Sequence, residues 1–373
     1  MKRNTSITFF LAVFSQLCIA ALGRITYDGL VLTSIDVTPV KDKPGFVTFK
    51  GGKLGKSDDD TATFLDNVKQ INDTDEAGER LFEGRKLSVA EAKAIINKAS
   101  PDGKNGKPLF CLHGFTVQPG AQLKAFNEKR MKGTFSKGKF MPVPVIWPTQ
   151  GGIDYWGDRG NSAPGAGKAF KTLKRGVDSF PSKSILCHSM GNWVLRHAAD
   201  AKFRFDNIFL VGAVSADVKF ICLSKCKPFS ICIFSFLIHH FIVSDQDVRY
   251  DLFQKKYIRE SNDERREDGL RICKMLTDKN KGKVHILYNA WDYALIFSSL
   301  NPTTWLTRIG TLGYKSYRNW RGAWTEDEGV VDDEVKGSLK NFNAGAKLSW
   351  SNMAAHSYQY EDFCVKYYQD NHY

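Results

Sequence analysis

The stretch Ser184–Asp200 holds the serine whose surroundings best suit chemistry. An apolar run ends at His188, Ser189 follows, and Gly191 precedes apolar residues at helical spacing. A strand, a tight turn and a helix with serine at the turn form a nucleophile elbow, whose motif is G-x-S-x-G. Such a serine attacks an acyl carbon, so the pattern favours transfer of an acyl group from an ester-like bond to water. The alternative is a serine that only caps a helix.

The motif departs from the usual pattern at one position. Cys187 stands two residues before Ser189, where glycine is usual, while Gly191 fills the second small position. Because cysteine is small, we expect the turn to form. The backbone N–H of Met190 would then donate to a forming oxyanion, and the N-terminus of the helix would favour negative charge there.

A serine nucleophile of this kind needs an acid and then a histidine later in the chain. Asp292 comes just after the apolar run Val284–Tyr288, at the position of ligand-facing residues in open α/β sheets. There it would orient the histidine ring and stabilise its charged form. The alternative for this aspartate is a helix cap.

The histidines that follow Asp292 are His356 and His372. His372 lies next to the C-terminus, whereas His356 lies in an expected loop ahead of a helix. We therefore predict that His356 is the general base, with an ordinary surface histidine as the alternative.

The second oxyanion donor should come from the loop after an early strand. The apolar run Leu109–His113 leads directly into Gly114 and Phe115. Gly114 would let the backbone approach the substrate, and the N–H of Phe115 is the predicted donor. We expect the side chain of His113 to be structural rather than catalytic.

Short apolar runs that alternate with amphipathic segments must position these residues. The predicted strands are Leu109–His113, Val143–Trp147, Ser184–His188, Ile208–Val214 and Val284–Tyr288. The predicted helices between them are Ala121–Lys132, Ala163–Phe180 and Asn192–Phe203. This alternation predicts an α/β fold with a mostly parallel central sheet and helices on both faces. Earlier in the chain, Ser88 and Glu91 form a predicted capping box that opens a helix through about Ala99.

Taken together, these motifs resemble the α/β-hydrolase superfamily, and within it an uncharacterised branch of serine-hydrolase-like proteins. The residues that carry the resemblance are His113–Phe115, Trp147–Pro148, Tyr155, Asp158–Arg159, His188–Asn192, Tyr288–Asn289, Asp292–Leu295, Arg308–Gly310 and His356–Tyr358. The resemblance implies the α/β-hydrolase fold, with Ser189 as nucleophile, His356 as base and Asp292 as acid. It implies no particular substrate.

The composition and charge of the chain bear on which kinds of partner it can bind. The chain is 42% apolar and 25% charged, which is ordinary for a globular protein with a sizeable core. Its net charge of +13 could attract an acidic partner, but the basic residues are scattered and zinc-finger spacing is absent from the sequence. We predict no nucleic-acid partner, no metal and no organic cofactor. The expected substrate is a small-molecule or lipid ester; contact with a membrane surface and the oligomeric state stay open.

The chain divides into three predicted parts. Residues 1–23 are basic, then apolar, then small, which is the order of a secretory signal peptide. The apolar run falls short of the roughly 20 residues of a spanning helix, so secretion is favoured over membrane anchoring. Residues 24–106 form an N-terminal extension without a chemical motif, and residues 107–373 form the hydrolase domain.

An atypical apolar insertion is predicted at residues 218–247. Its removal would join Ala216-Asp217 to Val248-Arg249 in an unbroken strand-to-helix turn. An unspliced intron is favoured over a membrane-dipping loop, because a long exposed apolar loop is an aggregation hazard. Of the cysteines, Cys111 and Cys187 lie in apolar runs and are predicted to be buried thiols, whereas Cys273 and Cys364 are the best candidates for a disulfide.

Two rival functions remain beside the esterase. One is a catalytically inactive hydrolase fold used for binding, against which the intact serine, aspartate and histidine argue. The other is a lipase that works at a lipid surface, which the basic charge and the two apolar runs favour.

Overall fold

The structure is a computed structural model. It describes residues 24–51, 62–72, 80–100, 103–114, 117–127, 141–149, 173–198, 203–212, 272–278, 281–289, 292, 316–318, 324–326, 337–349 and 358–371. The strands of its main sheet are β1 (Thr26–Tyr27), β2 (Val31–Thr33), β3 (Thr38–Pro39), β4 (Phe46–Lys50), β5 (Thr63–Gln70), β6 (Leu81–Leu87), β7 (Pro108–Leu112), β8 (Met141–Ile146), β9 (Ser184–His188), β10 (Ile208–Val211), β11 (Val284–Tyr288) and β14 (Leu339–Asn343). A separate small sheet pairs β12 (Ser316–Arg318) with β13 (Trp324–Glu326).

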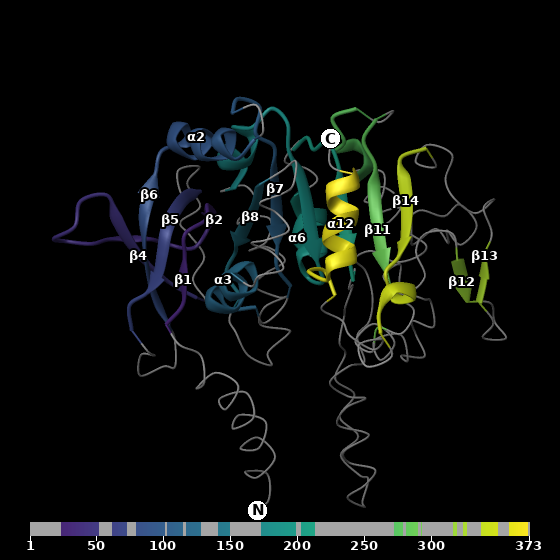
Figure 1. Cartoon of the computed structure of the whole chain (residues 1–373), viewed down its shortest axis with the longest axis horizontal. Helices are drawn as coiled ribbons and strands as arrows, with labels where there is room; N and C mark the ends of the chain where they lie inside the picture. Colours follow the sequence, from purple (N-terminus) through teal and green to yellow (C-terminus); the bar gives the residue numbers. More distant parts are fainter. Residues whose placement is uncertain are drawn as a thin grey trace, which may run out of the picture.

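The protein is of the α/β class, and its described residues form a mixed sheet of 12 strands, whose arrangement can be followed in Figure 1. The order across the sheet is β14-β11-β10-β9-β7-β8-β2-β5-β6-β4-β3, and β1 pairs with β5. Among the described strands, those from β14 to β2 run parallel and the others are antiparallel. The predicted parallel sheet is therefore present, and an antiparallel half extends it.

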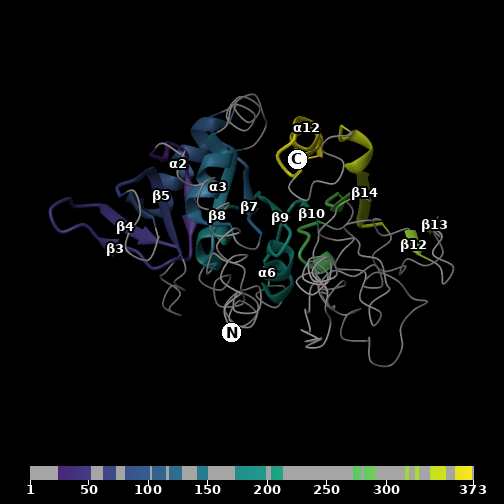
Figure 2. The ribbon, with the colours of Figure 1, turned by 90° about the horizontal axis from the view of Figure 1, so that it is seen from below.

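Helices cover both faces of the sheet, so the strands between them are buried on both sides. The described helices are α2 (Val89–Ala99), α3 (Pro119–Asn127), α6 (Gly191–Ala198), α12 (Asp362–Asn371) and the 3-10 helix η6 (Gly345–Lys347), and residues 173–178 and 272–274 are also helical. One apolar cluster contains buried residues of α2 and α6, and a second contains those of α3 and α12. Figure 2 shows α6 and α12 on opposite sides of the sheet.

The five strands predicted from apolar runs are confirmed, with bounds that shift by up to three residues. Each residue of β7, β9 and β10 is buried, as expected for parallel strands between two helical layers. The capping box at Ser88 is also confirmed: Ser88 Oγ accepts from the N–H of Glu91, whose carboxylate accepts from the N–H of Ser88.

The cysteine predictions were partly wrong. Cys111 and Cys187 are buried free thiols, as expected. Cys273 and Cys364 are also free and buried, so neither forms the disulfide for which it was a candidate. They belong to the two different apolar clusters, on opposite faces of the sheet, which no disulfide can bridge.

The segment 24–106, to which the sequence assigned no role, builds the antiparallel half of the sheet. It joins the parallel half where β2 pairs with β8. There Thr33 Oγ1 donates to the carbonyl of Ile146 at 3.1 Å and accepts from the N–H of Ile35 at 3.0 Å. The predicted signal peptide at 1–23 and the insertion at 218–247 lie outside the described residues. No described helix is long and apolar enough to cross a membrane.

Candidate active site

Ser189 lies at the tight turn between β9 and α6. Its φ angle is 51°, in the left-handed region that residues other than glycine rarely adopt. Ser88, which does cap a helix, has the ordinary extended backbone of a capping residue, with φ −70° and ψ 159°. Ser189 therefore does not have the geometry of a simple helix cap, and it is 7% exposed.

Hydrogen bonds to the neighbouring strand and helix hold this turn. The N–H of Ser189 donates to the carbonyl of Val211 at the end of β10, at 3.0 Å. The carbonyl of Ser189 accepts from the N–H of Asn192 at 3.0 Å and from its Nδ2 at 2.8 Å. Asn192 is fully buried and also donates to the carbonyl of Val211. Sequence reasoning assigned Asn192 no role beyond the resemblance, although a polar amide among the apolar residues of a helix was a usable signal.

Two glycines allow the chain to pass close to Ser189. A Cβ added at Gly114 would lie 2.8 Å from Ser189 Cβ and 3.2 Å from its Oγ. A Cβ added at Gly191 would lie 2.9 Å from the carbonyl oxygen of His113. The backbone after β7 therefore lies directly against the serine side chain. Cys187 packs inside the apolar core, and burial raises the pKa of its thiol far above the usual range, so it remains a thiol.

His113 fixes the loop that carries Gly114. Its ring stacks on Trp147, with centroids 5.0 Å apart and planes at 9°. Its Nε2 accepts from the N–H of Trp147 at 3.3 Å, so its Nδ1–H donates to the carbonyl of Gly114 at 3.0 Å. Burial lowers the pKa of His113 to about 4, while the hydrogen bond to the carbonyl of Gly114 acts in the opposite direction. The ring is therefore neutral at physiological pH.

Asp292 is fully buried just beyond the end of β11, where its N–H donates to the carbonyl of Asn289 at 3.1 Å. Its charge acts on Tyr358: burial raises the pKa of that phenol well above the usual range, and Asp292 raises it further. The buried Tyr358 hydroxyl donates to the carbonyl of Leu287 and accepts from the N–H of Gly212. Sequence reasoning gave Tyr358 no role of its own.

The structure thus brings together four of the predicted site residues and their supports. Ser189, Met190, Gly114 and His113 meet where β9 and β7 end, with Met190 buried under the turn. Asp292 follows β11, which is separated from β9 by β10. The predicted base His356 and the predicted donor Phe115 lie outside the described residues.

The topology places Ser189 at a switch point. From β7 the chain proceeds to β8 on one side, then returns to β9 on the other side and continues outward to β10 and β11. Open α/β sheets bind ligands beyond the carboxyl ends of the strands where the strand order reverses in this way. Gly114 follows β7 and Ser189 follows β9, so both lie at that point.

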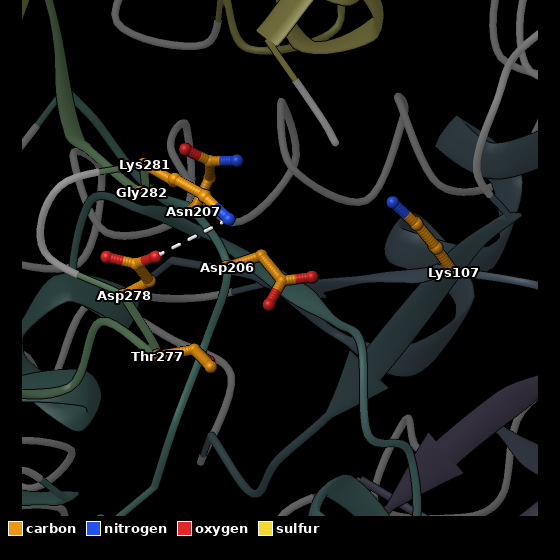
Figure 3. Close-up of a pocket in the computed structure, with 7 residues that line it drawn as sticks. All are labelled: Lys107, Asp206, Asn207, Thr277, Asp278, Lys281 and Gly282. Atoms are coloured by element: carbon orange, nitrogen blue, oxygen red, sulfur yellow. Dashed lines mark ion pairs between the residues drawn. The ribbon is translucent and has the colours of Figure 1, made fainter.

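A pocket of about 550 Å³, drawn in Figure 3, lies next to residues that precede β7, β10 and β11, and therefore at the opposite edge, where the strands begin. Its lining consists of Lys107, Asp206, Asn207, Thr277, Asp278, Lys281 and Gly282. The two lysines and two aspartates balance in charge, and Lys281 pairs with Asp278 at 3.9 Å. Asn207 Oδ1 already accepts from the N–H of Lys283 and from His285 Nε2. The pocket lies at the wrong edge of the sheet for the chemistry of Ser189.

Within the described residues, no three His, Cys, Asp or Glu side chains gather in a way that could hold a metal ion. Comparisons of the chain with models of protein families, with curated proteins and with solved structures gave no match. The geometry of the site therefore carries the functional argument.

Proposed function

We propose that the protein is a serine hydrolase with the α/β-hydrolase fold, which cleaves a carboxylic ester, thioester or lactone through Ser189. The observation that carries this proposal is the left-handed backbone of Ser189 at a strand-to-helix turn, at the switch point of the sheet. A strained turn of this kind exposes a serine hydroxyl above the sheet in a nucleophile elbow. The backbone of Gly114 beside its Oγ is where an oxyanion loop should pass.

In the proposed reaction, Ser189 Oγ attacks the acyl carbon while His356 takes its proton. His356 then gives that proton to the leaving alcohol or thiol, and an acyl-enzyme remains. Water enters, His356 takes a proton from it, and the resulting hydroxide attacks the acyl carbon. Breaking the bond to Ser189 Oγ releases the acid and returns the proton to the serine. Asp292 orients the imidazole and stabilises its charged form.

The backbone N–H groups of Met190 and Phe115 are the proposed oxyanion donors, each worth roughly 3 kcal/mol in hydrolases generally. The hydrogen bond from His113 to the carbonyl of Gly114 supports the second assignment. The ring of His113 holds the carbonyl of Gly114, the residue that directly precedes Phe115 in the chain. His113 is then a positioning residue, and its neutral Nδ1–H tautomer is the form that does this.

The placement of Tyr358 supports the pairing of His356 with Asp292. The hydroxyl of Tyr358 is hydrogen-bonded to the ends of β10 and β11, and it lies close enough to Asp292 that the charge of this aspartate raises the pKa of the phenol. His356 precedes it by two residues, a stretch of chain that spans at most about 7 Å. The order serine, aspartate, histidine in the chain is also that of α/β-hydrolases.

The test is labelling by a fluorophosphonate probe and hydrolysis of short p-nitrophenyl esters. We expect wild-type protein to be labelled and active, and Ser189→Ala to lose both. Ser184→Ala is the matched control, because Ser184 is a buried serine at the start of the same strand, where its Oγ accepts from the N–H of Asn207. If wild-type protein is not labelled, or if Ser189→Ala is labelled equally, the assignment of Ser189 as nucleophile is wrong. Either result would favour the rival function, a catalytically inactive hydrolase fold used for binding.

We also propose entry into the secretory pathway, which rests on the sequence of residues 1–23. Mass spectrometry of the mature N-terminus tests it in a eukaryotic host. Loss of about the first 23 residues is the expected result, and a mature protein that retains Met1 would contradict it.

A further inference from the structure

The hydroxyl of Tyr358 forms a hydrogen-bonded bridge between the carboxyl ends of two central strands, β10 and β11. The last paired residues of β10 and β11 are Val211 and Leu287. Beyond them the N–H of Gly212 still reaches the carbonyl of Leu287, but at 3.4 Å. The Tyr358 hydroxyl donates to that carbonyl at 3.0 Å and accepts from the N–H of Gly212 at 3.2 Å. A side chain distant in sequence thus completes the last rung of the ladder.

This bridge is rigid because the phenol is wholly buried. Tyr358 is 0% exposed and lies in the apolar cluster beneath α12. Burial and the charge of Asp292 both keep the hydroxyl protonated. It can therefore always donate to Leu287, from whose strand the chain continues through a tight turn to Asp292.

We propose that Tyr358 is a positioning residue of the proposed catalytic site, which ties together the strand ends that carry the turns of Ser189 and Asp292. This inference rests on the proposed function. A phenol bonded to both β10 and β11 holds two turns in place: the serine turn through Val211, and the aspartate turn through Leu287. Loss of the hydroxyl loosens Asp292 relative to Ser189 Oγ.

The experiment compares Tyr358→Phe with Tyr367→Phe. Tyr367 is the matched control, because its hydroxyl bonds His285 Nδ1 in the amino-terminal half of β11, away from the serine. Both variants lose one phenol hydroxyl. For Tyr358→Phe we expect kcat for a short p-nitrophenyl ester to fall about tenfold or more with little change in KM. For Tyr367→Phe we expect kcat to stay within about twofold of wild type.

A double-mutant cycle separates positioning from general stability. Tyr358→Phe is combined with Asp292→Asn, and the rate of fluorophosphonate labelling is measured well below the melting temperature of each variant. If the hydroxyl acts by positioning Asp292, its loss has little further effect once that carboxylate is gone, so the two effects are strongly non-additive. Additive effects, or a Tyr358→Phe variant with wild-type kcat, would overturn the inference while Ser189 and His356 still stood as catalytic. Wild-type protein that is not labelled overturns the proposed function and this inference together.

Discussion

The strain at Ser189 is a cost that the surrounding residues must offset. A non-glycine residue in the left-handed region costs on the order of 1–3 kcal/mol. The hydrogen bonds from Ser189 to Val211 and from Asn192 to Ser189 hold that conformation in place. A turn that only reversed the chain would be satisfied by glycine at this position. The serine is therefore kept where its hydroxyl, rather than its backbone, is the useful part.

The first prediction concerns the space beside that hydroxyl. In Gly114→Ala, the new Cβ would lie 2.8 Å from Ser189 Cβ and 3.1 Å from His188 Nδ1. We expect fluorophosphonate labelling to slow by about 100-fold and the free energy of unfolding to fall by about 1–3 kcal/mol. Gly337→Ala is the control, because a Cβ there meets nothing within 4 Å. Labelling of Gly114→Ala at the wild-type rate would mean that the loop does not border the reacting hydroxyl.

The second prediction concerns acid stability. His113 has a native pKa of about 4, below the value of about 6.5 in an unfolded chain. Between these pH values the unfolded state binds more protons, so stability is complete above about pH 6.5 and falls as pH falls toward 4. The contribution of His113 to the loss between pH 7 and pH 5 is about 2 kcal/mol.

Denaturant unfolding at both pH values measures this loss, in wild type and in His113→Asn, which cannot titrate. Buried His285, whose pKa is lowered to about 3, stays in both proteins and contributes equally. The wild type should therefore lose about 2 kcal/mol more than the variant. Equal losses would show that His113 is protonated in the native protein at pH 5.

Some residues of the proposed site could be predicted from the sequence, and others could not. Ser189 and Gly191 were found because an elbow is a local pattern, and Asp292 because it follows an apolar strand. Tyr358 was missed as a strand-end bridge, since its partners Gly212 and Leu287 are far away in the chain. Hydrogen bonds of that range follow from tertiary packing, which a single sequence does not display.

Strands were visible in the sequence where both faces are buried. β7 and β9 read as continuous apolar runs because helices cover both sides. β5 was missed because its apolar residues do not alternate with polar ones, and Asp66 follows two of them directly. That carboxylate is buried and pairs with Arg85 at 2.5 Å, and the next residue, Asn67, has φ 49° at a shift of register. A bulge and a partly buried ion pair remove the period-two signal.

The third prediction tests the join between the two halves of the sheet. Thr33→Val keeps the shape of the buried side chain but leaves the N–H of Ile35 without its acceptor and removes the donor to Ile146. We expect a loss of about 1–3 kcal/mol in the free energy of unfolding. Thr48→Val is the control, because its exposed hydroxyl makes only a 3.4 Å contact with the carbonyl of Thr38. Similar losses in both variants would contradict a special role for the β2–β8 join.

At the scale of the whole molecule, the segment 24–106 is part of the structure that supports the site. Leu30, Leu32 and Phe64 lie in the same apolar cluster as Val194 and Leu195 of α6. Phe64 also packs edge-to-face on Phe180, with centroids 6.0 Å apart. The parallel half therefore completes its core with residues that the sequence motifs do not include. Sequence motifs identify residues that take part in chemistry, so they do not identify an apolar residue that contributes only to packing.

The last prediction follows from this shared core. Deletion of 24–106 would expose one edge of β8 and the apolar side chains that face Leu32 and Phe64, each worth roughly 1.5–3 kcal/mol when buried. We expect the shortened chain to lack a cooperative unfolding transition and to resist labelling at Ser189.

The control for this deletion keeps every residue and cuts only the connection. A protease site inserted between Lys104 and Asn105, in the exposed loop before β7, can be cleaved after folding. The two fragments should stay associated through β2 and β8, with a single melting transition and wild-type labelling. A shortened chain that melts cooperatively and labels normally would show that residues 107–373 fold alone, and that the antiparallel half is an appendage. Dissociation of the cleaved fragments under native conditions would show that the shared core is too weak to support the site.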